Sequence, residues 1–266
     1  MDYPRLQTLN TVTLPRLADM LKVSGQQPLH LTLAASLHVF AVAVWFLLES
    51  ASAYRFYPNY YWAHNAISDL GIPYDFEDDK HGNRISRSQH SSLMNTNFRI
   101  IAVMYAVGQI VMLYGAKEEL PDARTEPWRY VREIRVALSL IFMSGLFTAG
   151  CVHAGPQENA DGQIIIHLTG AMLAIFAGNL NSILCAVISC PLKTSMGKQY
   201  QVISFALGVL GVVGGLCTQI ASAYGYTGIS ERLSVYCILA WGLVTGLAIL
   251  FYPAQREEQR QRAKHK

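Results

Sequence analysis

Six apolar stretches constrain the fold of this chain more than any other feature. They lie at His30–Ala53, Ile100–Gly115, Val136–His153, Ile164–Cys190, Val202–Tyr224 and Leu233–Tyr252. A helix of about 20 apolar residues crosses a hydrocarbon core about 30 Å thick. Because lipid offers no partners to unpaired peptide groups, and because the stretches are continuous rather than alternating, each is expected to be a helix. The sequence therefore predicts an all-α, polytopic integral membrane bundle of six transmembrane helices.

The composition agrees with a membrane protein. Only 15% of the residues are charged and 52% are hydrophobic, whereas about 25% are charged in average soluble domains. The cysteines lie in or beside apolar stretches without CxxC spacing, so we interpret them as small hydrophobic residues. No nucleic-acid module and no phosphate-binding glycine loop is found. We predict no cofactor and no nucleic-acid partner.

The chain divides into a cytosolic N-terminal segment (1–29), a transmembrane domain (30–252) with an outer loop insert (54–97), and a basic cytosolic tail (253–266). The N-terminal segment lacks the pattern of a cleaved signal peptide. Six spans place both termini on one side of the membrane. Of the 21 lysines and arginines, 15 fall on that side, so the positive-inside rule predicts cytosolic termini. The sequence does not indicate which membrane is involved.

Polar residues gather on the predicted outer face, where the loop YYWAHNAISDLG (60–71) meets the ends of several helices. Burying a charged group at the centre of a bilayer costs about 2.5 to 3.5 kcal/mol. Charged residues at or near the membrane are therefore candidates for function. The predicted catalytic residues are two acids and two histidines, Asp69, Glu231, His153 and His167. The residues predicted to bind substrate are His64, Asn65, Ser68, Arg99, Arg232, Trp62 and Tyr61.

Three kinds of chemistry stay open for this group. An acid, Asp69 or Glu231, can donate a proton with a histidine as its partner. A metal ion can be held by His153, His167 and Asp69, although the histidine spacing is unlike that of known metal motifs, and we predict no metal. Ser68 can act as a nucleophile with a histidine base, although no GxSxG elbow surrounds it.

The loop aromatics between Tyr54 and Trp62 are interpreted as an interfacial belt. A second possibility is that some rings turn inward and stabilise positive charge on a hydrophobic substrate. An acid above a dry, aromatic cavity is what epoxide-opening cyclisation of an isoprenoid requires. We therefore predict an integral membrane enzyme that acts by acid–base chemistry on a hydrophobic, isoprenoid-like small molecule, surrounded by membrane lipid.

Three alternatives remain: a lipid hydrolase, a small-molecule or proton-coupled transporter, and a non-catalytic membrane scaffold. A transporter needs polar groups through the depth of the bilayer. The predicted cytosolic half of the helices is mostly apolar, and this mildly favours an enzyme.

The motifs also occur in an order typical of one family: AISDLG (66–71), Asn95–Arg99, GCVHAG (150–155) followed by His167, and GISERLSVYCILAW (228–241). This pattern resembles the polytopic membrane family labelled domain of unknown function 998, over roughly residues 30–252. The resemblance implies a bundle of about six helices and no particular reaction. It places five of the site residues on motif positions: Ser68, Asp69, His167, Glu231 and Arg232.

Overall fold

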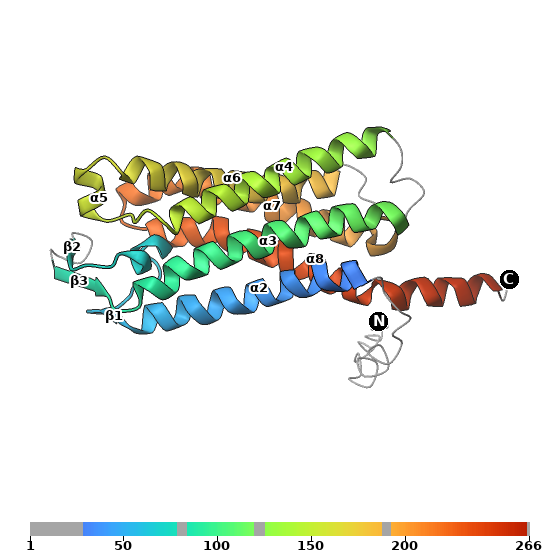
Figure 1. Ribbon diagram of the computed structural model, residues 1–266, viewed down its shortest axis with the longest axis horizontal. Helices are drawn as coiled ribbons and strands as arrows, with labels where there is room; N and C mark the ends of the chain where they lie inside the picture. Colours follow the sequence, from blue (N-terminus) through green and yellow to red (C-terminus); the bar gives the residue numbers. More distant parts are fainter. Residues whose placement is uncertain (1–28, 79–83, 120–125, 188–192, 265–266) are drawn as a thin grey trace, which may run out of the picture.

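The apolar stretches form long helices in a computed structural model that describes residues 29–78, 84–119, 126–187 and 193–264. The long helices are α2 (Leu29–Tyr54), α3 (Ser91–Glu119), α4 (Glu126–Ala149), α6 (Ile164–Val187), α7 (Lys193–Ala223) and α8 (Thr227–Lys264). They run side by side along the length of the molecule (Figure 1). The prediction of an all-α polytopic bundle is confirmed.

Among the described residues, five of these helices are long and apolar enough to cross a membrane, namely α2, α3, α6, α7 and α8. Helix α4 differs because Arg129, Arg132, Glu133 and Arg135 lie in its first half. It is still part of the bundle, packed along α3 and α6. The prediction of six apolar spans is therefore supported for five helices, and the sixth is present as a more polar one.

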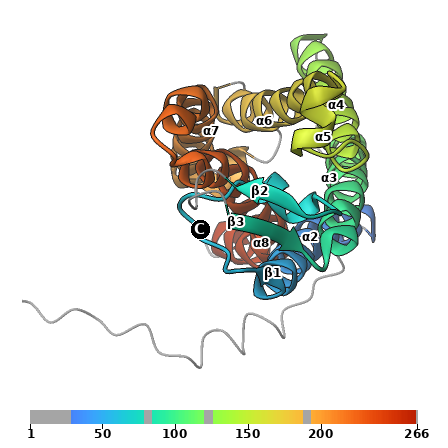
Figure 2. The same ribbon diagram turned by 90° about the vertical axis from the view of Figure 1, so that its left-hand side faces the viewer.

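The long helices form a ring in the order α2, α3, α4, α6, α7, α8, and α8 packs back against α2 (Figure 2). Helix α8 also contacts α6 across the ring. Small residues allow close approach where α4 crosses α6. A Cβ atom on Gly145 would lie 2.7 Å from the backbone nitrogen of Ala174 and closer still to the backbone oxygen of Gly170. Such contacts stabilise helix pairs in lipid, where the hydrophobic effect contributes little.

One end of the bundle carries a small cap, which we call the sheet end (Figure 1). Its elements are the strands β1 (Phe56–Tyr57), β2 (Phe76–Asp78) and β3 (Arg84–Ser88), the 3₁₀ helix η1 (Ile67–Gly71) and the short helix α5 (Pro156–Ala160). The strands are antiparallel with β3 in the middle. The described part of the 54–97 insert therefore contains three short strands and a 3₁₀ helix, and it covers the ends of the helices.

Helices α3, α4, α7 and α8 all begin before their predicted starts. Helix α4 begins at Glu126 instead of Val136, α7 at Lys193 instead of Val202 and α8 at Thr227 instead of Leu233. Helix α3 begins at Ser91, well before the predicted start at Ile100. Its polar first turns are satisfied by neighbours, because Asn97 donates a hydrogen bond to the backbone oxygen of Trp45 at 3.2 Å and Asn95 donates to that of Gly71 at 2.8 Å. Helix α8 continues past residue 252 to Lys264, and its last part projects from the bundle (Figure 1).

Candidate functional site

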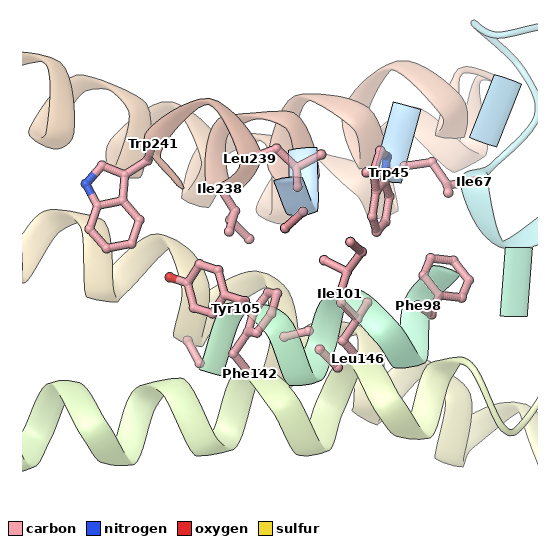
Figure 3. Close-up of a cluster of buried hydrophobic side chains, with 14 of the residues drawn as sticks. Trp45, Ile67, Phe98, Ile101, Tyr105, Phe142, Leu146, Ile238, Leu239 and Trp241 are labelled. Carbon is pink, nitrogen blue, oxygen red and sulfur yellow. The ribbon is translucent and has the colours of Figure 1, made fainter. Parts of the chain in front are cut away.

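An apolar cavity lies inside the ring at the sheet end. Its empty volume is about 520 Å³. Helices α2, α3, α4, α6 and α8 supply the wall, and Ser68 of η1 lies at one end. The ionisable residues in this wall are His167 and Glu231. Figure 3 shows much of the apolar part: Trp45, Phe98, Ile101, Phe142, Leu146, Ile238 and Leu239.

Glu231 lies in the first turns of α8, directly against η1. Its Oε2 atom accepts a hydrogen bond from the backbone N–H of Ile67 at 2.7 Å. Within the described part of the chain, its other oxygen makes no hydrogen bond. One oxygen thus fixes the carboxyl group, and the other is available to a molecule in the cavity.

His167 enters the cavity from the first turn of α6. Its Nδ1 atom lies 2.6 Å from the backbone oxygen of Val152. Since a carbonyl oxygen only accepts, Nδ1 carries a proton, and in the neutral ring Nε2 is then the proton acceptor. The turn before α6 therefore holds the imidazole in the tautomer that a general base needs.

Asp69 lies next to Ser68 on η1 but does not line the cavity. Its carboxylate accepts hydrogen bonds from the backbone N–H of Ala66 at 2.9 Å and from the Asn65 side chain at 3.2 Å, so it caps the start of η1. It is close enough to act electrostatically on both His167 and Glu231. The three predicted catalytic groups therefore share one neighbourhood, with Asp69 in a supporting position.

His153 lies outside the cavity, in a cluster that holds α5. Its Nδ1 atom is 3.1 Å from Glu158 Oε1, and the Tyr74 hydroxyl donates a short hydrogen bond to the other oxygen of Glu158. Burial and this hydrogen bond raise the pKa of Tyr74 to about 12. Burial alone raises the pKa of Glu158, but hydrogen bonds from Tyr74, from its own backbone N–H and from His153 together outweigh it and hold that pKa below its ordinary value. We call His153, Glu158 and Tyr74 the cap cluster.

Arg232 turns away from the cavity and holds the loop before η1. Its guanidinium donates hydrogen bonds to the backbone oxygens of Trp62 at 2.8 Å and Asn65 at 2.9 Å, and a short one to the Tyr60 hydroxyl. Burial raises the pKa of Tyr60 well above its ordinary value, so at neutral pH its hydroxyl keeps its proton and donates it to the Ala66 oxygen at 2.8 Å. The arginine therefore acts as a clamp between α8 and this loop.

The partner of this clamp is Glu49, which lies near the end of α2. Glu49 is fully buried and forms an ion pair with Arg232 at 3.2 Å. Trp45 and Tyr236 also donate hydrogen bonds to it, at 2.8 Å and 3.0 Å. An acidic residue near the end of an apolar helix indicates that a cation lies close by. The sequence does not reveal that this cation is Arg232.

The remaining predicted binding residues support the loop or lie at its surface, and none of them lines the cavity. His64 contacts the backbone oxygen of Gly225 at 2.8 Å, and Asn65 accepts from the backbone N–H of Tyr61 at 3.0 Å. Arg99 bonds within its own helix, to Asn95 and Thr96. Trp62 lies 4.7 Å from the Arg232 guanidinium and is 44% exposed.

The loop aromatics mostly face outward, as an interfacial belt would. Tyr54 and Tyr57 are strongly exposed, and Tyr61 and Trp62 are partly so. The aromatic rings in the cavity come instead from the helices and are those of Trp45, Phe98 and Phe142.

A second polar cluster occupies the half of the bundle away from the sheet end. Arg135 is fully buried and donates to Asn181 at 2.8 Å and to Gln109 at 3.1 Å. Gln109 lies 2.7 Å from His38, and Asn181 donates to Ser139 at 3.1 Å. The expectation that this half is mostly apolar is therefore wrong. The available signal was one polar residue at a similar depth in each of several apolar stretches.

Within the described residues, no three histidine, cysteine or acidic side chains group in the way that a metal ion requires. His153 and His167 bond to different partners, Glu158 and the Val152 backbone. The geometry thus offers no observation in favour of the metal alternative.

A match to a known family covers most of this helix ring. A family model described as "Protein of unknown function (DUF998)" matches residues 39–248. The chain belongs to the DUF998 family. The match begins within α2 and ends within α8, so the cavity and its polar end lie inside the DUF998 region. No curated protein and no solved structure matches the chain.

Proposed function

We propose that this DUF998 protein is an integral membrane enzyme that acts by acid–base chemistry on a lipid-soluble substrate. The observation that carries the proposal is the pairing of Glu231 and His167 in the wall of an otherwise apolar cavity. Groups of this kind can transfer protons when they are held within reach of one substrate. The scarcity of other polar groups there strengthens their electrostatic effect on a bound molecule.

The two groups have complementary positions. The free oxygen of Glu231 is placed to donate a proton when the carboxyl group is protonated. Nε2 of His167 is placed to accept one, because Nδ1 is bound to the Val152 oxygen. Asp69 acts through them, by capping η1 and by its charge. We name Asp69 a positioning residue for this reason.

Epoxide-opening cyclisation of an isoprenoid-like substrate is the reaction that we propose first. Glu231 protonates the epoxide oxygen, and the C–O bond breaks. A double bond of the same substrate attacks the electron-poor carbon and forms a C–C bond. His167 then removes a proton from a neighbouring carbon, so the product is an isomer and no oxidant is needed. The rings of Trp45 and Phe98 in the wall can stabilise the positive charge.

The test is a lipid and terpenoid profile of cells that express the protein and its variants. Glu231→Gln keeps the shape but removes the acid, and His167→Asn removes the base, so each is expected to lower product by about 10²-fold or more. Asp69→Asn is expected to have a smaller effect. Glu133→Gln, on an exposed part of α4 outside the cavity, is the matched control. Unchanged profiles for Glu231→Gln and His167→Asn at normal protein levels would remove the enzyme proposal.

A lipid hydrolase is the second candidate, since Ser68 lines the same cavity as His167. A serine nucleophile needs its base within hydrogen-bonding reach. No hydrogen bond joins Ser68 to His167 in the described part of the chain. Ser68→Ala separates the two reactions: a hydrolase loses activity, whereas an acid–base isomerase keeps most of it.

A transporter is the third candidate, and the polar cluster around Arg135 is the observation that favours it. Together with the sheet-end groups, this cluster provides polar contacts at two depths, as a transport path requires. Gln109→Met tests it. A transporter is expected to lose uptake in reconstituted vesicles, whereas the enzyme is expected to keep its lipid profile because Gln109 does not line the cavity.

A further inference from the structure

We infer that the cavity measures chain length: it binds a molecule with one polar end at the sheet end and one apolar part about ten carbons long. The inference deepens the proposed function by naming the class of substrate, and it rests on that function only for the chemistry at the polar end.

The polarity of the wall defines the orientation of the ligand. Ser68, His167 and Glu231 all lie at the sheet end, in η1 and in the first turns of α6 and α8. Every other lining residue is apolar. A ligand with one polar group is therefore expected to place that group at the sheet end and its hydrocarbon part further into the bundle.

The length of the cavity follows from the helices that line it. On α6 the lining extends from His167 to Ile175, and on α8 from Glu231 to Leu239. Each interval rises about 12 Å at about 1.5 Å per residue. A carbon chain of that length has about ten atoms, since each C–C bond of about 1.5 Å advances it by somewhat less. A phospholipid acyl chain that fills half of a core of about 30 Å is longer than this.

The far end of the cavity is closed by packed side chains. Phe142 lies at this end, and its ring is 4.2 Å from that of Tyr105, which is followed by Trp241 (Figure 3). Ile238 closes the same end from α8. Behind both lies Gly178, where an added Cβ would be 2.7 Å from Ile238 and 3.0 Å from Phe142. This floor is supported from behind and is expected to resist displacement by a longer chain.

The size of the cavity points to a single chain. Its empty volume is about 520 Å³ with its opening included, and the two acyl chains of a diacyl lipid would need a larger space. The ligand class is therefore a lipid-soluble molecule with one narrow apolar chain.

The test uses straight-chain primary alcohols of six to sixteen carbons as probes. The full-length protein is purified in a bulky steroid detergent, and its thermal midpoint is measured with each alcohol. We expect stabilisation to peak at about ten carbons and to fall for longer chains. Stabilisation that rises steadily with chain length, as simple partitioning predicts, would overturn the inference.

Two substitutions locate the effect in the cavity. Phe142→Leu shortens the floor residue and is expected to move the optimum by roughly two to three carbons towards longer alcohols, the length of the ring that is lost. Ala174→Leu fills the lining and is expected to abolish the stabilisation. Leu173→Ala is the matched control, because Leu173 is 46% exposed and lines a groove on the outer side of α6 instead. A folded Phe142→Leu protein with an unchanged optimum contradicts the inference.

The result separates this inference from the proposed function. A length optimum that moves with Phe142→Leu supports a cavity that selects chain length, even if Glu231→Gln leaves the lipid profile unchanged. In that case the protein binds the molecule but is not an enzyme. A changed lipid profile without any length optimum supports the enzyme proposal and contradicts the inference that the cavity selects chain length.

Discussion

Arg232 illustrates how a single residue can be part of the GISERLSVYCILAW motif (228–241) and yet not line the cavity. It follows Glu231 directly, but successive residues of a helix point in different directions. Glu231 faces the cavity, while Arg232 pairs with Glu49 and the loop before η1. Of these two neighbouring residues, Glu231 therefore lines the cavity and Arg232 holds the loop.

The Glu49–Arg232 pair is expected to be the main polar contribution to stability at the sheet end. Arg232→Met leaves a fully buried carboxylate without its cation, which costs about 3 to 5 kcal/mol of unfolding free energy. The double variant Glu49→Gln, Arg232→Met is expected to lose less than the sum of the single losses. Denaturant unfolding in detergent measures both values.

Arg99→Met is the control for this measurement. Arg99 bonds only to neighbours on α3 in the contacts given above, so its loss is expected to cost less than about 1 kcal/mol. Equal losses for the two arginine variants would show that Arg232 is not a clamp.

At the scale of elements, the cap cluster ties the turn between α4 and α6 to the sheet end. Tyr74 comes from the segment between η1 and β2, whereas His153 and Glu158 come from the turn. The same turn supplies the Val152 oxygen that orients His167. Movement of this short segment would therefore disturb the tautomer of His167 as well as the cover of the cavity.

The cap cluster is expected to weaken in acid. Because the folded pKa of Glu158 lies below its ordinary value of 4.5, its stabilisation is present above pH 4.5 and is lost as the pH falls through the lower folded pKa. Hydrogen exchange of residues 152–163, corrected for the intrinsic rate at each pH, is expected to show loss of protection below pH 4.5.

Glu158→Gln serves as the control for the acid effect. It removes the titrating group, so it is expected to give lower protection at neutral pH and no step in acid. A step of the same size in this variant would assign the acid effect to another group.

At the scale of the whole molecule, the ring of helices has two chemically different ends. The sheet end carries the cap, η1 and the polar end of the cavity, and α2 begins and α8 ends at the other (Figure 1). Of the 21 lysines and arginines in the sequence, 15 belong to the side with the termini. This distribution supports the proposal that the termini are cytosolic and the cavity is nearer the opposite face.

Reporter fusions test this orientation. Alkaline phosphatase, which is active only outside the cytosol, is expected to be inactive when it is fused after Lys266 and active when it is inserted after Asp161 beside α5. A cytosolic fluorescent protein should give the opposite pattern. Activity of the phosphatase at the C-terminus would invert the proposed topology.

The sequence predicted the existence of the helices well, because helix formation in lipid depends on residues that are close together in the chain. A continuous apolar stretch in lipid has to satisfy its own peptide groups, and the helix does this within the stretch. The polar start of α3 was missed, because Asn95 and Asn97 become acceptable in a helix only through partners on η1 and α2. The charged first half of α4 also packs in the bundle because of partners on other helices. Arg135 donates hydrogen bonds to Gln109 and Asn181.

By itself, the sequence determined that this protein is a membrane bundle and that one set of polar groups lies near the ends of its helices. Only the tertiary structure decided which of those groups meet: Ser68, His167 and Glu231 in the cavity, His153 in the cap, and Arg232 on Glu49. The physical reason is that hydrophobicity and helix formation depend on neighbours along the chain. The direction in which a side chain points depends on how each helix is rotated against the others, and packing alone sets that rotation.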